Sequence, residues 1–142
     1  MTAGPSPRKT VVRLDLSFPA DLARVPDALE QASAVVTQLY SADTRDMIQL
    51  ALQEALTNAV VHGSAEDASL TVHFRIEQDT DSVLFTVSDS GRGFDPATLP
   101  DPRTEDRMRE PRGRGIFMIH RLMDEVEFRH GGSEIRMRKR RA

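Results

Sequence analysis

The stretch QEALTNAVVHG places a glutamate and an asparagine one helical turn apart. On a helix over 41–63, Glu54, Asn58 and His62 share one stripe. The residues beside that stripe are apolar and predict a partly enclosed space: Met47, Leu50, Ala51 and Val61. There, Asn58 can supply an oxygen ligand to Mg²⁺ held with phosphates, and Glu54 can accept a proton from an attacking hydroxyl. An ordinary surface pair has the same spacing, so this interpretation requires phosphate-binding loops elsewhere in the chain. His62, near the helix end, is expected to cap or pack instead of catalysing.

Two glycine-containing segments can supply such loops. SDSGRGFD follows a predicted strand, so Asp89 stands at the strand end, and Gly91 and Gly93 let the backbone turn tightly beside a ligand. In PRGRGIFMIHRLM, Gly113 and Gly115 come just before a predicted helix, whose free N–H groups attract phosphate. Each segment alone also fits an ordinary turn. Together with the Glu54 helix, and in this order, the three segments predict a nucleotide site.

The pattern of apolar residues predicts the elements that must position these side chains. Alternation of apolar and polar residues predicts strands, and recurrence at three to four residues predicts helices. A helix ending at Gly63 would place Glu54 and Asn58 in its last turns. The expected strands are 12–18, 70–77, 83–88, 125–129 and 134–138, and the expected helices are 25–40, 41–63 and 116–123. Hairpins mixed with helices predict an α+β fold, an antiparallel or mixed sheet with helices covering one face.

Composition limits the classes of protein that fit. A chain of 142 residues suits one domain, expected over 11–140 after a flexible, Pro-rich segment, 1–10, that lacks the apolar stretch of a signal peptide. No apolar run approaches the length of a membrane span, so we expect a cytoplasmic protein without a membrane partner. Without cysteine there are no disulfides or thiolate nucleophiles. A net charge of −3 argues against direct nucleic-acid binding, although the last seven residues include five basic ones.

The three motifs together resemble the histidine-kinase-like ATPase superfamily. In that comparison Glu54–Asn58 is the N box, Asp89–Gly93 the G1 box and Gly113–Gly115 the G2 box. The resemblance runs from about residue 11 to residue 138, nearly the whole chain. It implies an ATP-binding two-layer α/β sandwich with a mixed, mostly antiparallel sheet.

The same resemblance implies a role for each motif residue. Asp89 would accept a hydrogen bond from the adenine amino group, and Asn58 would hold Mg²⁺. Residues 96–112 would form a lid over the phosphates. Ser133 stands where the family usually has a threonine whose hydroxyl supports the adenine site, and serine keeps that hydroxyl. The remaining implied nucleotide-binding residues are Gly91, Gly93, Gly113, Arg114 and Gly115, with Arg112 as an alternative to Arg114.

Glu54 and the chain length indicate which branch of the histidine-kinase-like ATPase superfamily this chain resembles. Sensor histidine kinases resemble one another in carrying asparagine at this position, because a neutral ring nitrogen is already nucleophilic, whereas an alcohol or water is helped by a base. Only 53 residues precede Glu54, too few for the histidine-bearing domain of a sensor kinase. The topoisomerase and mismatch-repair branches also use glutamate but require additional transducer domains. None of these three branches is therefore expected.

EALTNAVVHG, VSDSGRGFDP and RGRGIFMIHRLMDEVEF resemble small bacterial anti-sigma factors that are also serine/threonine kinases. This resemblance implies a protein that sequesters a sigma factor, phosphorylates an anti-anti-sigma protein with a STAS domain, and forms a homodimer. In the implied mechanism Glu54 deprotonates the target hydroxyl while Mg²⁺ on Asn58 bridges the phosphates.

Two other functions remain as alternatives. The first is a switch of the same fold that binds ATP and sequesters a regulator without phosphotransfer, against which the intact Glu54 and Asn58 count. The second is an adaptor that binds RNA or DNA through the basic tail. Aromatic residues make up only 5% of the chain, which provides no evident stacking platform for the bases.

Overall fold

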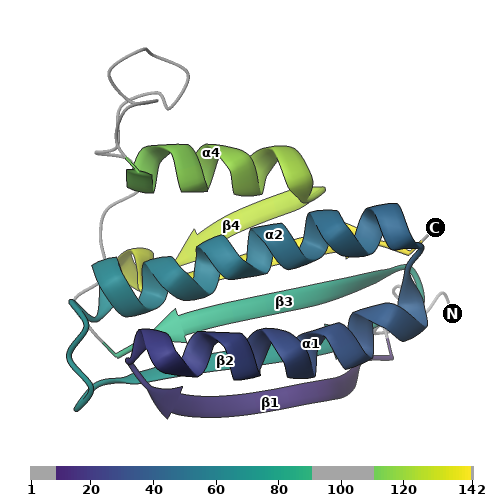
Figure 1. Cartoon of the computed structure of the whole chain (residues 1–142). Coiled ribbons are helices and arrows are strands. Elements are labelled where there is room, and N and C mark those ends of the chain that lie inside the picture. The colour runs from purple at the N-terminus through teal and green to yellow at the C-terminus, as the bar shows by residue number, and fades with distance from the viewer. Residues whose placement is uncertain (1–8, 91–110, 142) are drawn as a thin grey trace, which may run out of the picture.

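In the part of the chain that the structure describes, five strands form one sheet, and three α-helices lie side by side across one of its faces (Figure 1). The computed structural model describes residues 9–90 and 111–141, with the backbone alone for 111–114. The strands are β1 (Val11–Pro19), β2 (Thr71–Gln78), β3 (Ser82–Asp89), β4 (Glu125–Arg129) and β5 (Glu134–Arg140). The α-helices are α1 (Val25–Leu39), α2 (Ala42–Asn58) and α4 (Pro111–Leu122). Short helical turns are η1 (Leu22–Arg24), η2 (Ala59–Gly63) and η4 (His130–Gly132).

The strand order is β1-β2-β3-β5-β4, and every pairing between these strands is antiparallel. The α+β sandwich with helices on one face is therefore confirmed. The expectation allowed a mixed sheet, but the described strands contain no parallel pair. The last strand of the chain, β5, lies inside the sheet between β3 and β4, so the second hairpin joins the first through β3.

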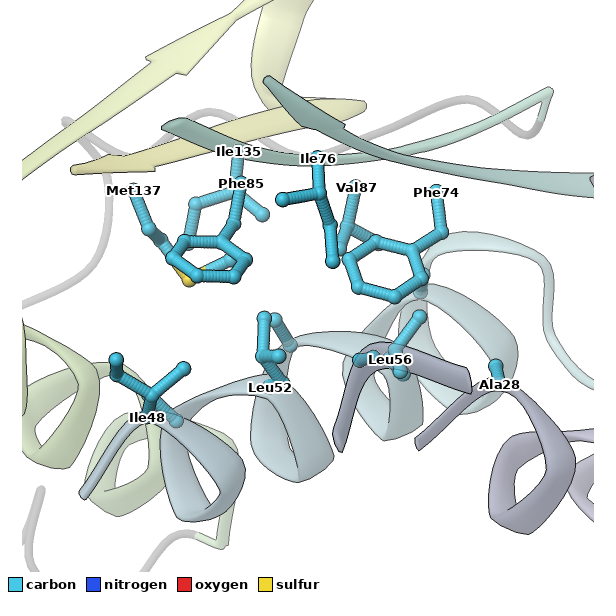
Figure 2. Close-up of a cluster of buried hydrophobic side chains, with 14 of the residues drawn as sticks. Ala28, Ile48, Leu52, Leu56, Phe74, Ile76, Phe85, Val87, Ile135 and Met137 are labelled. Carbon is cyan, nitrogen blue, oxygen red and sulfur yellow. The ribbon is translucent and has the colours of Figure 1, made fainter. Parts of the chain in front are cut away.

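The hydrophobic core lies between the sheet and the helices. In Figure 2, Phe74, Ile76 and Phe85 point from the sheet toward α2. Leu52 and Leu56 of α2 point back toward them, and all five side chains are fully buried. Because side chains alternate along a strand, the intervening residues fall on the other face, which is polar and includes the Arg75–Glu77 ion pair. The alternation in the sequence thus corresponds to one buried and one polar face.

One side of α1 packs into this core. Pro26 sits in its first turn, where a missing N–H costs nothing, and the buried residues recur at helical spacing as Val25, Ala28, Ala32, Val35 and Val36. Tyr40 ends the helix, and its hydroxyl donates a hydrogen bond to the Lys139 carbonyl oxygen at 2.9 Å. Burial raises the pKa of Tyr40 above its usual value, which favours the protonated hydroxyl that donates this bond. This bond connects α1 to the end of β5.

One helix begins earlier than predicted, and another ends at the predicted residue but with a different last turn. The helix α4 begins at Pro111 instead of Ile116, so Gly113 and Gly115 lie inside it and not before it. Proline is well suited to the first helical position, which explains how a glycine-rich segment can start a helix. The second helix does end at Gly63, but its last turn, η2, is π-helical, and the left-handed residues that redirect the chain are Ala65 and Glu66.

The described part of the chain contains no helix long and apolar enough to cross a membrane.

Candidate nucleotide-binding site

Glu54 and Asn58 lie one turn apart on α2, half-buried, where α4 packs across α2. The backbone of α4 comes close to both side chains at Gly115. A Cβ built on Gly115 would lie 2.6 Å from Glu54 Oε2 and 3.6 Å from Asn58 Nδ2. Only glycine therefore fits here without moving the glutamate. The structure thus brings together the predicted base, the predicted Mg²⁺ ligand and one predicted phosphate-loop glycine.

Three of the predicted site residues line one cavity between α2 and the sheet. Asn58 contributes from the end of α2, Asp89 from the end of β3 and Ser133 from the position just before β5. The rest of the lining is small or apolar: Ala55, Ala59, Gly63, Val87, Ile116, Phe128, Gly132 and Ile135. A mostly apolar cavity with a few converging polar groups is the usual form of a small-molecule site. Glu54 lies one turn from Asn58, outside this lining.

Asp89 is held at the cavity by pairing between β3 and β5. Its backbone N–H donates a hydrogen bond to the Ser133 carbonyl oxygen at 2.9 Å. Its carboxylate packs directly against Gly63, where a Cβ would overlap the carboxylate oxygens. The side chain is half-buried, so its carboxylate can meet a ligand in a place with little bulk water.

Ser133 follows a turn with an unusual backbone. His130, Gly131 and Gly132 have φ angles of 54°, 66° and 89°, all in the left-handed region. The Ser133 hydroxyl donates to the His130 carbonyl oxygen at 2.8 Å, which closes this turn. Because the hydroxyl proton is engaged in this hydrogen bond, the Ser133 hydroxyl can act toward a ligand only as an acceptor.

Several predicted residues cannot be placed. Gly91, Gly93 and residues 96–110 of the expected lid lie outside the described residues. Gly113 and Arg114 belong to the first turns of α4, and the side chains of Arg112 and Arg114 lie outside what the structure describes. Their roles toward phosphate stay predictions. His62 is exposed at the end of η2 and does not line the cavity.

The sequence did not reveal one close contact and one exposed side chain. Gly63 was expected only to end a helix, yet it lines the cavity and contacts Asp89. Leu50 was expected beside an enclosed space, yet it is 42% exposed, whereas Ala51 next to it is fully buried. The helical spacing of Ala55, Ala59 and Gly63 on one side of the Asn58 turn was the available signal for the cavity wall.

The donor atoms fit Mg²⁺ that is shared with a phosphorylated ligand. Among the described residues no group of three or more histidine, aspartate or glutamate side chains could hold a metal alone. Mg²⁺ commonly binds through one or two protein oxygens together with substrate phosphates and waters. Asn58, half-buried at the cavity, can provide one such oxygen.

Comparisons with known proteins agree with this geometry. The model of the histidine kinase-like ATPase domain matches residues 18–139. The serine-protein kinase RsbW of Staphylococcus aureus (strain MSSA476) is 32% identical over 135 residues, which cover 82% of this chain and 83% of that protein. RsbW of Listeria monocytogenes (strain EGD-e) is 33% identical over 96 residues, or 62% of this chain and 60% of that protein. This chain therefore belongs to the histidine kinase-like ATPase family and is a relative of the RsbW kinases, the anti-sigma factor kinase family that its motifs resemble.

Proposed function

We propose that this protein is an anti-sigma factor that transfers the γ-phosphoryl group of ATP to a serine or threonine of a partner protein. The observation that carries the proposal is the position of Glu54. A carboxylate one turn from Asn58, beside the start of α4 and just outside the cavity, is where an incoming hydroxyl would meet the end of a bound triphosphate.

The cavity residues would bind the nucleotide. Asp89 accepts a hydrogen bond from the adenine amino group, and the apolar walls, which include Val87, Ile116, Phe128 and Ile135, surround the purine ring. Asn58 would hold Mg²⁺ through its side-chain oxygen. When bound, the metal neutralises charge on the β- and γ-phosphates. Residues at the start of α4, with N–H groups at a positive dipole end, would stabilise the negative charge on the transferring group.

The chemical step would use Glu54 as the general base. The serine or threonine hydroxyl attacks the γ-phosphorus, a new P–O bond forms, and the bond to the β-phosphate oxygen breaks. Glu54 takes the hydroxyl proton, and the electron pair leaves with ADP. An alcohol at neutral pH is a weak nucleophile, so this step needs a base in a way that imidazole phosphorylation does not.

The partners follow from the relationship to the RsbW kinases. The substrate would be a small anti-anti-sigma protein with a STAS domain, and the sequestered partner would be a sigma factor. We propose that the protein acts as a homodimer in the cytoplasm. Support comes from similarity along most of the chain to proteins named serine-protein kinases.

The test is a phosphotransfer assay with purified protein, γ-labelled Mg-ATP and an extract of its own organism. Acid-stable label on a small protein is expected, because serine and threonine phosphoesters survive acid. Glu54→Ala should reduce turnover by roughly 10²- to 10⁴-fold while ATP still binds. The matched control is Glu30→Ala, which removes an exposed glutamate of α1.

Two outcomes would contradict the proposal. Unchanged labelling by Glu54→Ala would refute the role of the base. ATP binding with no label on any protein would indicate a switch that sequesters its partner without phosphotransfer.

A further inference from the structure

Gly63 lies so close to the Asp89 carboxylate that a side chain at position 63 would collide with it. The three atoms closest to a Cβ built on Gly63 all belong to the Asp89 side chain: both carboxylate oxygens and Cγ. Overlap of this kind is never tolerated by real Cβ atoms, so one of the two groups would have to move. Asp89 and Gly63 also line the same cavity, so any movement of the carboxylate changes the cavity.

Backbone conformation does not explain why residue 63 is a glycine. Gly63 is the last residue of η2, and the glycines with positive φ in the described residues are Gly131 and Gly132. Any L-amino acid could adopt the helical backbone at position 63, and alanine would ordinarily be favoured over glycine there. What excludes a side chain is the carboxylate of Asp89.

The π-helical turn explains why residue 63 reaches Asp89. The Ser64 N–H donates to the Ala59 carbonyl oxygen at 2.9 Å, a bond that spans five residues instead of four. This wider turn follows α2 directly and packs against β3. Such turns are frequent at functional sites, because the extra residue redirects the helix end. Here it places Gly63, which has no side chain, directly against the Asp89 carboxylate at the end of β3.

We propose that Gly63 is a positioning residue for adenine recognition. Because Gly63 has no side chain, the Asp89 carboxylate has room to lie where it can accept a hydrogen bond from the adenine amino group. A side chain at position 63 would push the carboxylate out of that position. This inference rests on the proposed function, in which Asp89 reads adenine. It adds that selectivity for adenine depends on a residue at the end of η2 as well as on Asp89 at the end of β3.

The probe is a pair of nucleotides, ATP and purine riboside 5′-triphosphate, which is ATP without the exocyclic amino group. Dissociation constants for both, with Mg²⁺, would be measured for the natural protein, Gly63→Ala and Asp89→Ala. The natural protein should prefer ATP by about 10- to 100-fold, the usual effect of one hydrogen bond to a charged group. Both variants should bring that ratio close to one.

Gly131→Ala is the matched control. It also adds a methyl group to a glycine near the cavity, but a Cβ there would meet nothing within 4 Å. Its left-handed φ of 66° makes alanine strained, so some stability is lost. The preference for ATP should nevertheless stay at the value of the natural protein.

Thermal unfolding supplies a second, independent test that holds even if Gly63→Ala folds poorly. In the natural background Gly63→Ala should lower the Tm, because the methyl group meets the carboxylate. In an Asp89→Ala background the obstruction is gone, and Gly63→Ala should leave the Tm unchanged or raise it. An equal decrease in both backgrounds would show that Gly63 acts through something other than Asp89 and would overturn the inference.

The outcomes separate this inference from the function on which it rests. If the natural protein binds both nucleotides equally, adenine reading by Asp89 fails, and the inference fails with it. If Asp89→Ala loses the preference while Gly63→Ala keeps it, adenine reading stands and only the role of Gly63 is overturned. Loss of the preference in both variants, with the control unchanged, supports both.

Discussion

At the scale of single residues, two glycines shape the candidate site by leaving room for two carboxylates. Gly63 lies against Asp89, and Gly115 lies against Glu54, each from a different element. The two contacts differ in what a methyl group would displace. At Gly115 the nearest atom is Oε2, the far end of a flexible side chain, whereas at Gly63 it is a short carboxylate held close to the backbone of β3. Substitution at Gly115 should therefore be tolerated by the fold more easily than substitution at Gly63.

This difference leads to a prediction for Gly115→Ala. The glutamate should rotate away from the added methyl group, so the protein should fold, but the carboxylate should no longer reach the attacking hydroxyl. Displacing a reacting group by about 1 Å can cost roughly 10²-fold in rate, and we expect a decrease in kcat of that order. Steady-state kinetics of phosphorylation of the partner protein would measure this decrease, and far-UV circular dichroism would confirm that the variant folds. A variant with full kcat would mean that Glu54 is not held by this contact.

At the scale of elements, α2 serves both the core and the site. Its buried side contains Ile48, Leu52 and Leu56, which point toward the sheet (Figure 2). Glu54 and Asn58 lie on another stripe, close to Gly115 of α4. Because the buried stripe fixes the rotation of the helix about its axis, it also fixes the direction of the Glu54 stripe. Packing of the core thus determines where the candidate base points.

Two leucines on α2 test whether its buried and exposed sides lie where the structure places them. Leu52 is fully buried and Leu50 is 42% exposed, so Leu52→Ala should lower the free energy of unfolding by about 2–5 kcal/mol, as expected for a cavity in a packed core. Leu50→Ala should change it by less than about 0.5 kcal/mol. Urea denaturation of both variants would measure the difference. Equal effects would mean that the core does not lie where the structure places it.

At the scale of the whole molecule, strand order assembles the site. Residues 54–63, Asp89, Gly115 and Ser133 come from four separate parts of the chain. Because β5 enters between β3 and β4, the turn before it lies next to the end of β3, and the Ser133 carbonyl accepts the Asp89 N–H. The packing of α4 on α2 then adds Gly115.

Binding across several elements predicts that the nucleotide stabilises the whole fold. A ligand that binds only the folded protein adds about 2.7 kcal/mol of stability at 100 times its Kd. Mg-ATP should therefore raise the Tm of the natural protein, measured by differential scanning fluorimetry, and the shift should grow with ATP concentration. In Asp89→Ala the shift at the same ATP concentration should be much smaller, since binding is weaker. An equal shift in that variant would contradict the role assigned to Asp89.

Much of this organisation follows from local patterns in the sequence. Alternation and helical spacing predicted the strands and helices to within a few residues, apart from the start of α4, because one buried face per element imposes those periods. The i, i+4 spacing of Glu54 and Asn58 placed both on one stripe of α2, and the order of the three motifs predicted the family.

Only the tertiary structure decided which residues from distant segments meet. The sequence could not show that the turn after Asn58 is π-helical, or that Gly63 lies beneath the carboxylate of Asp89. It also could not separate exposed Leu50 from buried Ala51, since both are apolar neighbours of the same stripe. The physical reason is that local periodicity reports how a segment faces the core, whereas contacts between segments depend on strand order and helix packing, which are long-range properties.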